Sequence, residues 1–208
     1  MNGAERLLYR NFAHFAFNQV LLPLKLLIPQ PVVARIPGLT TNHEIRTAMV
    51  LAQVRGRLLD IGCGANDVVK QYRTRGGVGT GVDVYPWPGL DLLVDNTAQL
   101  PFLDRAFDTI SFVACLNHIP NRVDVLREAK RLLQPGGIVL VTNLTPGLSR
   151  LWHKWAFWDA DQHERGMATG EVFGFTHEDL LNLLQKAGFQ FVKCQPFSWG
   201  LNSLYTFR

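Results

Sequence analysis

The chain has 208 residues, of which 47% are hydrophobic and 18% are charged. This length predicts one α/β domain with extensions, and the composition excludes a disordered chain. The net charge of +4 is only mildly basic, and the Lys and Arg residues are scattered along the sequence. A nucleic-acid partner is therefore not expected, because a nucleic-acid footprint would cluster these charges.

Three cysteines are spread through the chain, namely Cys63, Cys115 and Cys194. They are an odd number, and they lack the Cys-x-x-Cys spacing of zinc and redox motifs. They fit reduced thiols of a cytoplasmic protein better than a disulfide framework.

Residues 7–28 are rich in Leu, Phe and Val but are interrupted by polar residues and by Pro23. No uninterrupted stretch approaches the ~20 apolar residues that span a bilayer, and no secretory cleavage site follows. We therefore expect residues 1–40 to form an N-terminal helical extension. It either covers the domain as a lid, which we favour, or contacts a membrane as an interfacial helix.

The elements that follow alternate between helices and strands. The sequence Thr41-Asn42-His43-Glu44 matches a capping box and predicts a helix that runs to about Val54. Further helices are expected over residues 65–75, 121–133 and 177–187. Strands are expected over residues 57–61, 78–84, 90–94, 107–113, 138–141, 190–196 and 202–207, the last two as a hairpin. This alternation predicts a parallel sheet wound on both faces, with antiparallel pairing at one edge.

The first strand leads into a glycine-rich turn. Leu58, Leu59 and Ile61 are typical of a buried parallel strand, and Gly62 and Gly64 follow at once. The glycines let the backbone turn sharply and approach a ligand, which the N-terminus of the next helix would face. Strand, turn and helix together are typical of a nucleotide-binding βαβ unit.

A carboxylate stands at the end of the second strand. Asp83 is placed there to bind both hydroxyls of a ribose, as in dinucleotide-binding proteins. A dinucleotide-dependent dehydrogenase and an S-adenosylmethionine enzyme both fit the sequence up to this residue.

The later motifs distinguish these two classes. In chain order the sequence reads DIGCG, GVDV, LPF, FDTISF, LNHIP and LREAKRLLQPGG. This order resembles the class I S-adenosylmethionine-dependent methyltransferases, in particular the small-molecule and lipid-type branch that is methyltransferase type 11-like. The resemblance covers about residues 56–143 and extends to the helix and hairpin of residues 175–208. It implies a Rossmann-like seven-stranded sheet of order 3-2-1-4-5-7-6, with the last strand antiparallel, over residues 41–208.

The resemblance also implies a cofactor site. The loop after the first strand would lie beneath the methionine part of S-adenosylmethionine, and Asp83 would bind the ribose. For the adenine amine, counting back from LPF points to Asn96, whereas the chemistry points to Asp95, which we prefer. The implied cofactor-binding residues are Asp60, Gly62, Cys63, Gly64, Asp83, Val84, Asp95, Asn96, Ala114 and Cys115.

One position departs from the family pattern. The third glycine of Gly-x-Gly-x-Gly is Asn66 in this sequence. Asn is the residue best able to replace Gly at positive φ, so we expect the loop to be retained.

Methyl transfer requires alignment of the acceptor with the sulfonium methyl group, and an oxygen or carbon acceptor can also require a base. The candidate bases are His118, His153 and His163. His118 has the best case, because the loop after the fourth strand faces the carboxyl edge of the sheet. Asn117 is expected to point toward the substrate as well.

Residues 144–174 are the expected substrate cap. The aromatic residues expected to line an apolar pocket are Trp152, Trp155, Phe157, Trp158 and Phe173. The residues that resemble metal ligands in type are Asp159, Asp161, His163 and Glu164. Because these have no defined ligand spacing, no metal site is expected.

The expected function is S-adenosylmethionine-dependent methyl transfer to a small, apolar, aromatic or lipid-like acceptor. The alternative is a methyltransferase-like scaffold or partner subunit that binds the cofactor without catalysis of its own. A dehydrogenase is less favoured. Protein or tRNA methylation is disfavoured, because Cys-Leu-Asn-His follows the fourth strand in place of an Asn-Pro-Pro-Tyr-type motif.

Overall fold

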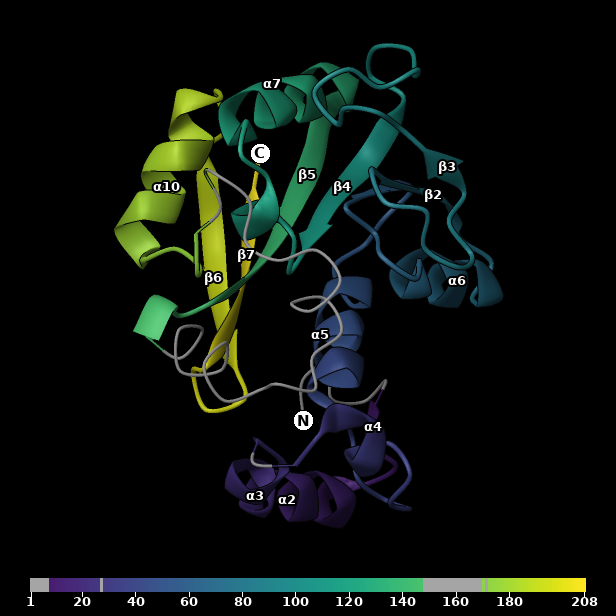
Figure 1. The fold of residues 1–208 in the computed structure, drawn as a ribbon, viewed down its shortest axis with the longest axis vertical. Coiled ribbons are helices and arrows are strands. Elements are labelled where there is room, and N and C mark those ends of the chain that lie inside the picture. The colour runs from purple at the N-terminus through teal and green to yellow at the C-terminus, as the bar shows by residue number, and fades with distance from the viewer. Residues whose placement is uncertain (1–7, 27, 148–169, 171) are drawn as a thin grey trace.

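The computed structural model describes residues 8–26, 28–147, 170 and 172–208. Its centre is a seven-stranded sheet of order β3-β2-β1-β4-β5-β7-β6 (Figure 1). Strands β1 to β5 pair in parallel, and β7 runs antiparallel to both β5 and β6. The predicted fold class and strand order are thus confirmed. The strands are β1 Arg57–Ile61, β2 Val78–Asp83, β3 Leu92–Leu93, β4 Phe107–Val113, β5 Leu133–Leu144, β6 Phe191–Phe197 and β7 Asn202–Phe207.

Helices cover both faces of this sheet. On one face, α5 (Asn42–Leu51) and α6 (Asp67–Thr74) pack with Leu58 of β1 and with Leu140. On the other face, α7 (Arg122–Leu132) and α10 (His177–Lys186) pack with Leu59. Adjacent residues of β1 therefore face opposite layers, as the two-residue period of a strand requires. Burial on both faces explains the continuous apolar runs of the sequence.

The capping box at the start of α5 is confirmed. The hydroxyl of Thr41 accepts a hydrogen bond from the Glu44 amide at 3.1 Å, and the Glu44 carboxylate accepts one from the Thr41 amide at 2.7 Å. Two orphan donors of the helix terminus are thereby paired. The helix ends at Leu51, earlier than the predicted Val54.

The start of β5 was predicted wrongly. The sequence predicted a helix stop at residues 133–137 and a strand from 138, but β5 already begins at Leu133. The reason is tertiary, because Leu133 pairs with Phe107 of β4 before a register shift brings Ile138 opposite Thr109. β3 is also shorter than the predicted residues 90–94.

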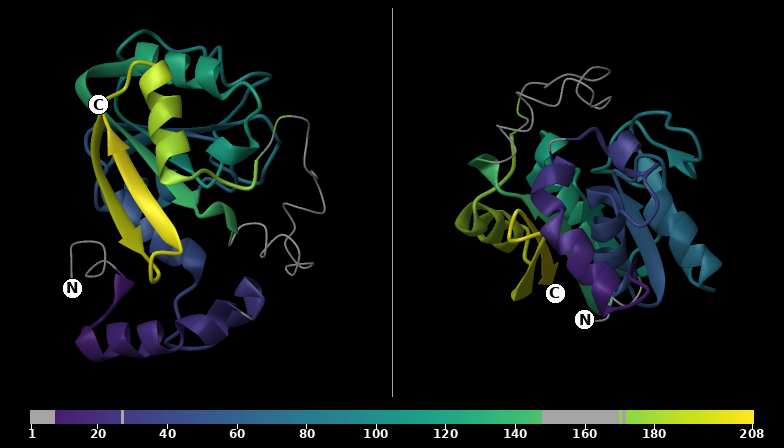
Figure 2. Two further views of the ribbon diagram at one scale, coloured as in Figure 1. Left: turned by 90° about the vertical axis from the view of Figure 1, so that its left-hand side faces the viewer. Right: turned by 90° about the horizontal axis from the view of Figure 1, so that it is seen from below.

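The predicted N-terminal helical extension is broken into short helices over its described residues, 8–26 and 28–40. They include α2 (Phe12–Val20), α3 (Leu22–Leu26) and α4 (Gln30–Val33). The prolines between and within them account for the breaks, since a proline interrupts helical hydrogen bonding. The helices form a layer on the side of the sheet to which the carboxyl ends of β4 and β5 point (Figures 1 and 2). Among the described residues, no helix combines the length and the apolarity that a membrane crossing needs.

A buried lysine ties this layer to the segment before α5. Lys25 is only 2% exposed, and its ammonium group donates at 3.0 Å to Asn18 Oδ1 and at 3.0 Å to the Thr40 carbonyl. Asn18 Oδ1 also accepts at 2.8 Å from both the amide and the hydroxyl of Thr40. Burial lowers the pKa of Lys25 to about 8. The layer is therefore docked through a polar network as well as through apolar contacts.

Candidate functional site

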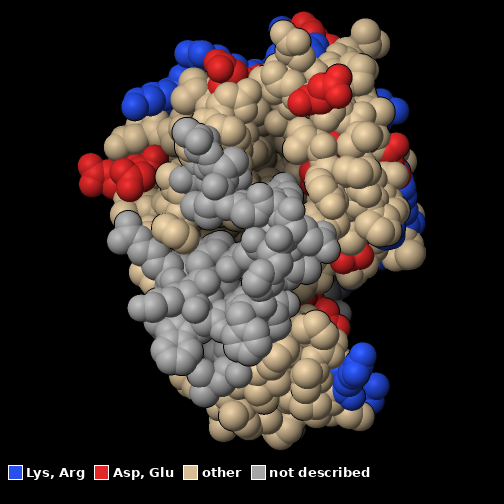
Figure 3. Space-filling model, in the orientation of Figure 1, with Lys and Arg blue, Asp and Glu red and all other residues tan. Residues whose placement is uncertain are grey.

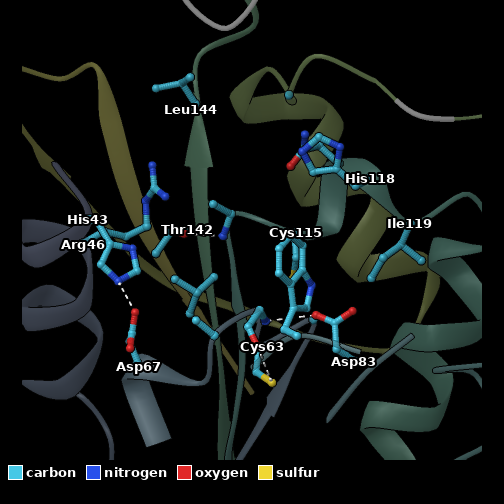
Figure 4. Close-up of a pocket in the computed structure, with 18 of the residues that line it drawn as sticks. His43, Arg46, Cys63, Asp67, Asp83, Cys115, His118, Ile119, Thr142 and Leu144 are labelled. Atoms are coloured by element: carbon cyan, nitrogen blue, oxygen red, sulfur yellow. Dashed lines mark hydrogen bonds and ion pairs between the residues drawn. The ribbon is translucent and has the colours of Figure 1, made fainter. Parts of the chain in front are cut away.

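A cavity of about 870 Å³ opens at the carboxyl ends of the parallel strands. Its walls come from the loops after β1, β2, β3 and β4, from the end of β5 and from the β6–β7 turn, with α4 and α5 at one side. Figure 4 shows side chains from several of these elements pointing toward the common space. The volume lies within the ~300–1,000 Å³ of small-molecule sites.

In the turn after β1, glycines line the cavity, so the backbone is not covered by side chains there. Gly62 and Gly64 have φ of +70° and +53°, in the left-handed region. A Cβ on Gly62 would also come within 2.7 Å of the Cys115 Cβ. Asn66 has φ of 65°, as expected for a residue that replaces glycine, and its side-chain amide donates at 3.1 Å to the Gly89 carbonyl. The departure from the family pattern thus retains the turn.

Asp83 joins this turn to β2. Its carboxylate is 4% exposed and accepts hydrogen bonds from the Gly64 amide at 2.9 Å and from the Tyr85 amide at 3.0 Å (Figure 4). Two carboxylate oxygens have about four acceptor positions, so capacity remains for a ligand's hydroxyls. Val84 and Trp87 line the same part of the cavity.

Asp95 and Asn96 both line the cavity after β3. The amide oxygen of Asn96 accepts from the Ala98 amide at 2.9 Å and from the Asn121 side chain at 3.3 Å. These bonds tie the Asn96 amide oxygen to its own loop and to Asn121 at the start of α7, whereas Asp95 is exposed at the cavity.

The loop after β4 forms the wall opposite α5. Ala114 adopts φ of 55°, and its amide donates at 2.9 Å to the hydroxyl of Thr142. The Cys115 thiol donates at 2.9 Å to the Ile61 carbonyl, and burial raises its pKa well above the usual range. Asn117 and His118 follow on the short 3₁₀ helix η1 (Leu116–His118), and both line the cavity.

Asp60 lies beneath the glycine turn and does not line the cavity. It is 1% exposed within β1 and accepts a hydrogen bond from the Ser111 hydroxyl at 2.6 Å. Burial raises the pKa of Asp60 to about 7, the Ser111 hydrogen bond lowers it, and the nearby Asp83 raises it. Asp60 thus supports the turn from below and stands outside the residues that line the cavity.

The site also contains residues that the sequence did not single out. His43 and Arg46 of α5 line the cavity beside Asp67, and a ring nitrogen of His43 lies 3.0 Å from the Asp67 carboxylate (Figure 4). Positions 43 and 46 share one face of a helix. The sequence predicts this helix from its capping box, and the spacing places His43 and Arg46 on one face of it. The sequence does not reveal that this face of α5 lines the cavity.

The family model described as a methyltransferase domain matches residues 40–193, which is most of the chain. The chain belongs to this methyltransferase family. The predicted family is thereby confirmed.

Curated methyltransferases are similar to this chain in sequence over part of their length. The ubiquinone/menaquinone biosynthesis C-methyltransferase of Brucella canis is 26% identical over 132 residues, which are 56% of this chain and 49% of that protein. The chain thus spans about half the length of the curated relatives it matches.

Two solved structures share the fold at lower identity. An S-adenosylmethionine-dependent methyltransferase of Thermotoga maritima has a TM-score of 0.60 at 20% identity, with 78% of this chain and 86% of that chain covered. The 1,6-didemethyltoxoflavin N1-methyltransferase of Burkholderia thailandensis, solved with S-adenosylhomocysteine, has a TM-score of 0.57 at 20% identity, with 78% and 76% covered. The sheet is that of the class I S-adenosylmethionine-dependent methyltransferases.

The structure of this methyltransferase gathers most of the predicted site residues. Of the ten cofactor-binding candidates, all except Asp60 line the cavity, and His118 does so too. Phe173 is the one predicted cap aromatic within the described residues, and it lies in the wall. Among the described residues, no group of three or more His, Cys, Asp and Glu could hold a metal ion. The candidates outside the described residues are Trp152, His153, Trp155, Phe157, Trp158, Asp159, Asp161, His163 and Glu164.

Proposed function

We propose that the protein transfers the methyl group of S-adenosylmethionine to a small, apolar, aromatic or lipid-like acceptor. The observation that carries this proposal is the joint placement of the glycine turn, Asp83 and Asp95 on one cavity. Bound there, the cofactor supplies an electrophilic sulfonium methyl group.

The residues present fit this cofactor. Gly64 has no atom within 4 Å of the place where a Cβ would stand, so its backbone is open to a ligand. Asp83 retains acceptor positions for a ribose diol, and Asp95 offers a carboxylate for the adenine amine. Trp87 adds an aromatic wall beside them.

The chain's contribution to transfer is chiefly positioning. The rigid turn and the two carboxylates hold one reactant while the loop after β4 and the β6–β7 turn hold the other. His118 is proposed to accept the proton that an oxygen or carbon acceptor releases. The His43–Asp67 pair is the second candidate, because a carboxylate orients the imidazole ring.

The nature of the acceptor is supported by the cavity wall and by the relatives. Ile119, Leu144, Phe173 and Leu201 make the wall beyond the cofactor part apolar. The named relatives are a C-methyltransferase of ubiquinone/menaquinone biosynthesis and an N1-methyltransferase solved with bound 1,6-didemethyltoxoflavin. A protein partner has a precedent among the structural neighbours, because a putative methyltransferase of Haloferax volcanii was solved in complex with the Trm112 methyltransferase activator.

Calorimetry and a transfer assay test the proposal. S-adenosylhomocysteine should bind and NAD should not, and mass spectrometry of co-purified ligands should give an acceptor that takes a labelled methyl group. NAD binding without a response to S-adenosylhomocysteine would contradict the proposal. Cofactor binding without transfer to any such acceptor would favour the scaffold.

Matched histidine variants identify the base. His118→Gln should reduce transfer by ~10²–10⁴-fold, the usual contribution of a general base, without changing the affinity for S-adenosylhomocysteine. If transfer instead falls with His43→Gln and not with His118→Gln, the His43–Asp67 pair accepts the proton.

Residues 1–40 are proposed to be a separate extension of the domain of residues 41–208, whose cap is residues 144–174. Gln30 of α4 lines the cavity, which supports a lid. No Asp or Glu occurs from residue 8 to 36, and Arg10 and Arg35 are exposed, which supports peripheral contact with an anionic membrane of a cytoplasmic protein. The large apolar residues exposed on this layer are Phe12, Phe17, Val20, Leu24, Val32 and Ile36.

A further inference from the structure

The turn between β6 and β7 has an unusual backbone. Ser198, Trp199 and Gly200 are consecutive and have φ of 50°, 58° and 79°, all in the left-handed region. Only the glycine adopts this region without cost, so the two preceding residues carry strain. Hydrogen bonds from the Gly200 amide to the Phe197 carbonyl and from the Leu201 amide to the Ser198 carbonyl, both of 3.1 Å, hold the turn. Such strain is frequent at functional sites.

The strained turn places two polar residues on the cavity wall. Ser198 and Asn202 both line the cavity, and they are only 6% and 5% exposed. Asn202 stands opposite Leu144 in the β5–β7 register, so this wall continues the end of β5. Trp199, between them in the sequence, is 63% exposed and does not line the cavity.

Neither polar group has a partner among the described residues. Ser198 Oγ and Asn202 Oδ1 are buried and make no hydrogen bond. Buried polar atoms are nearly always paired, because an unpaired one forfeits its bond to water. Because both residues line the cavity, a ligand bound there can supply the missing partner.

We propose that Ser198 and Asn202 recognise a neutral hydroxyl group of the methyl acceptor. Asn202 Oδ1 accepts only, whereas the serine hydroxyl both donates and accepts. A ligand hydroxyl satisfies the two at once, since it donates to Asn202 and accepts from Ser198. A ketone or an ether has no hydrogen to donate to Asn202.

The residues around Ser198 and Asn202 indicate the chemical class of the ligand that carries the hydroxyl group. Thr142, Leu144 and Leu201 lie on the same side of the cavity and carry no charge, whereas Asp83 and Asp95 lie at the cofactor side. An ionised carboxylate, which accepts only, has no hydrogen to donate to Asn202 Oδ1. The ligand class is therefore a phenol or a hydroxylated apolar molecule, an assignment that rests on the proposed methyl transfer.

The experiment uses the full chain saturated with S-adenosylhomocysteine and two probes, p-cresol and toluene, observed by ligand-detected NMR. Wild type should bind p-cresol more tightly than toluene. Ser198→Gly and Asn202→Leu should each weaken p-cresol by about three- to tenfold, the loss of one neutral hydrogen bond, and leave toluene unchanged. Ser203→Ala, a neighbouring serine that does not line the cavity, is the control and should change neither.

These variants are chosen to fold. Glycine at position 198 relieves the strain of a positive φ, and leucine at position 202 removes an unpaired buried oxygen, so both variants should melt at or above the wild-type temperature. Equal binding of p-cresol and toluene by wild type, or equal losses of both probes in the variants, would overturn the proposal. Failure of S-adenosylhomocysteine to bind wild type would instead contradict the proposed methyl transfer.

Discussion

Single residues of the site have distinct tasks despite similar chemistry. Asp60, Asp83 and Asp95 are all carboxylates near the glycine turn, but their exposure separates them. Asp60 is buried beneath the turn with Ser111, Asp83 spans the turn and β2, and Asp95 is exposed at the cavity rim. Position relative to the turn, more than residue type, decides which of them can contact a ligand.

Asp83→Ala should weaken binding of S-adenosylhomocysteine by about 1.5–3 kcal/mol, or roughly tenfold to 150-fold in Kd, because a hydrogen bond to a charged acceptor is lost. The fold should persist, since Asp83 stands at a strand end. Calorimetry measures the effect. Asp124→Ala, an exposed aspartate of α7, is the control, and an unchanged Kd in Asp83→Ala would move the ribose contact elsewhere.

Asp60 should make stability depend on pH. Burial raises its pKa to about 7, whereas an unfolded aspartate titrates near pH 4, so the native state binds more protons in this window. The free energy of unfolding therefore falls as pH rises from about 4 to about 7. Asp60→Asn has no carboxyl group to titrate, so its free energy of unfolding should not show this fall. The difference in free energy of unfolding between variant and wild type should therefore be more favourable to the variant at pH 8 than at pH 4, by on the order of 3 kcal/mol.

Urea unfolding at both pH values measures this gain. Asp124→Asn serves as the control, because its carboxylate is exposed. A gain for Asp60→Asn that is the same at both pH values would show that Asp60 titrates normally.

At the scale of elements, the Asn18 side chain is the centre of the hydrogen-bond network that holds the N-terminal layer. Asn18 Oδ1 accepts three hydrogen bonds, from the Lys25 ammonium and from the amide and hydroxyl of Thr40. Its side-chain amide also donates to the His14 and Gly38 carbonyls. One side chain thus joins α2, α3 and the segment that leads to α5.

Asn18→Ala should loosen the docking of α2 and α3, because it removes one of the two acceptors of the buried Lys25 ammonium and leaves the Thr40 amide without its acceptor. Hydrogen exchange over residues 12–26 should accelerate, while exchange in β4 and β5 stays slow. Gln19→Ala, at the adjacent helical position, is the control. Unchanged exchange in the Asn18 variant would show that apolar contacts alone hold the layer.

At the scale of the whole molecule, charge and apolar surface are distributed unevenly. On the face shown in Figure 3, Lys and Arg side chains lie around the rim instead of forming one patch. The N-terminal layer instead exposes large apolar residues, Phe17 at 51% and Val20 at 74%. A face of this kind is typical of an interface, so it is consistent with both roles proposed for this layer, a lid and a membrane contact.

The full chain with Phe17→Ser and Val20→Ser should float less with anionic vesicles than wild type and should bind S-adenosylhomocysteine equally well. Leu103→Ser, at an 85% exposed apolar residue elsewhere, is the control and should float normally. If flotation is unchanged while methyl transfer falls, the layer acts as a lid and not as a membrane contact.

The sequence predicted features that depend on residues close together in the chain, and it missed features that depend on tertiary contacts. The turn after β1, Asp83 and the capping box of α5 were read correctly because each depends on residues a few positions apart or on strand ends. Helix breaks in the extension and the early start of β5 were missed. The first depends on how short segments pack, and the second on pairing of Leu133 with Phe107.

The sequence by itself identified the family from the order of its motifs, and the resemblance to that family implied the strand order. It also singled out the residues of one half of the cavity, because they follow the carboxyl ends of strands that local sequence makes recognisable. Only the tertiary structure decided the other half. His43 reaches Asp67 from a separate helix, and Ser198 and Asn202 reach the cavity only because β7 pairs antiparallel with β5. Ser198 Oγ and Asn202 Oδ1 are buried without a partner in the described part of the chain, and this burial exists only after the chain has folded.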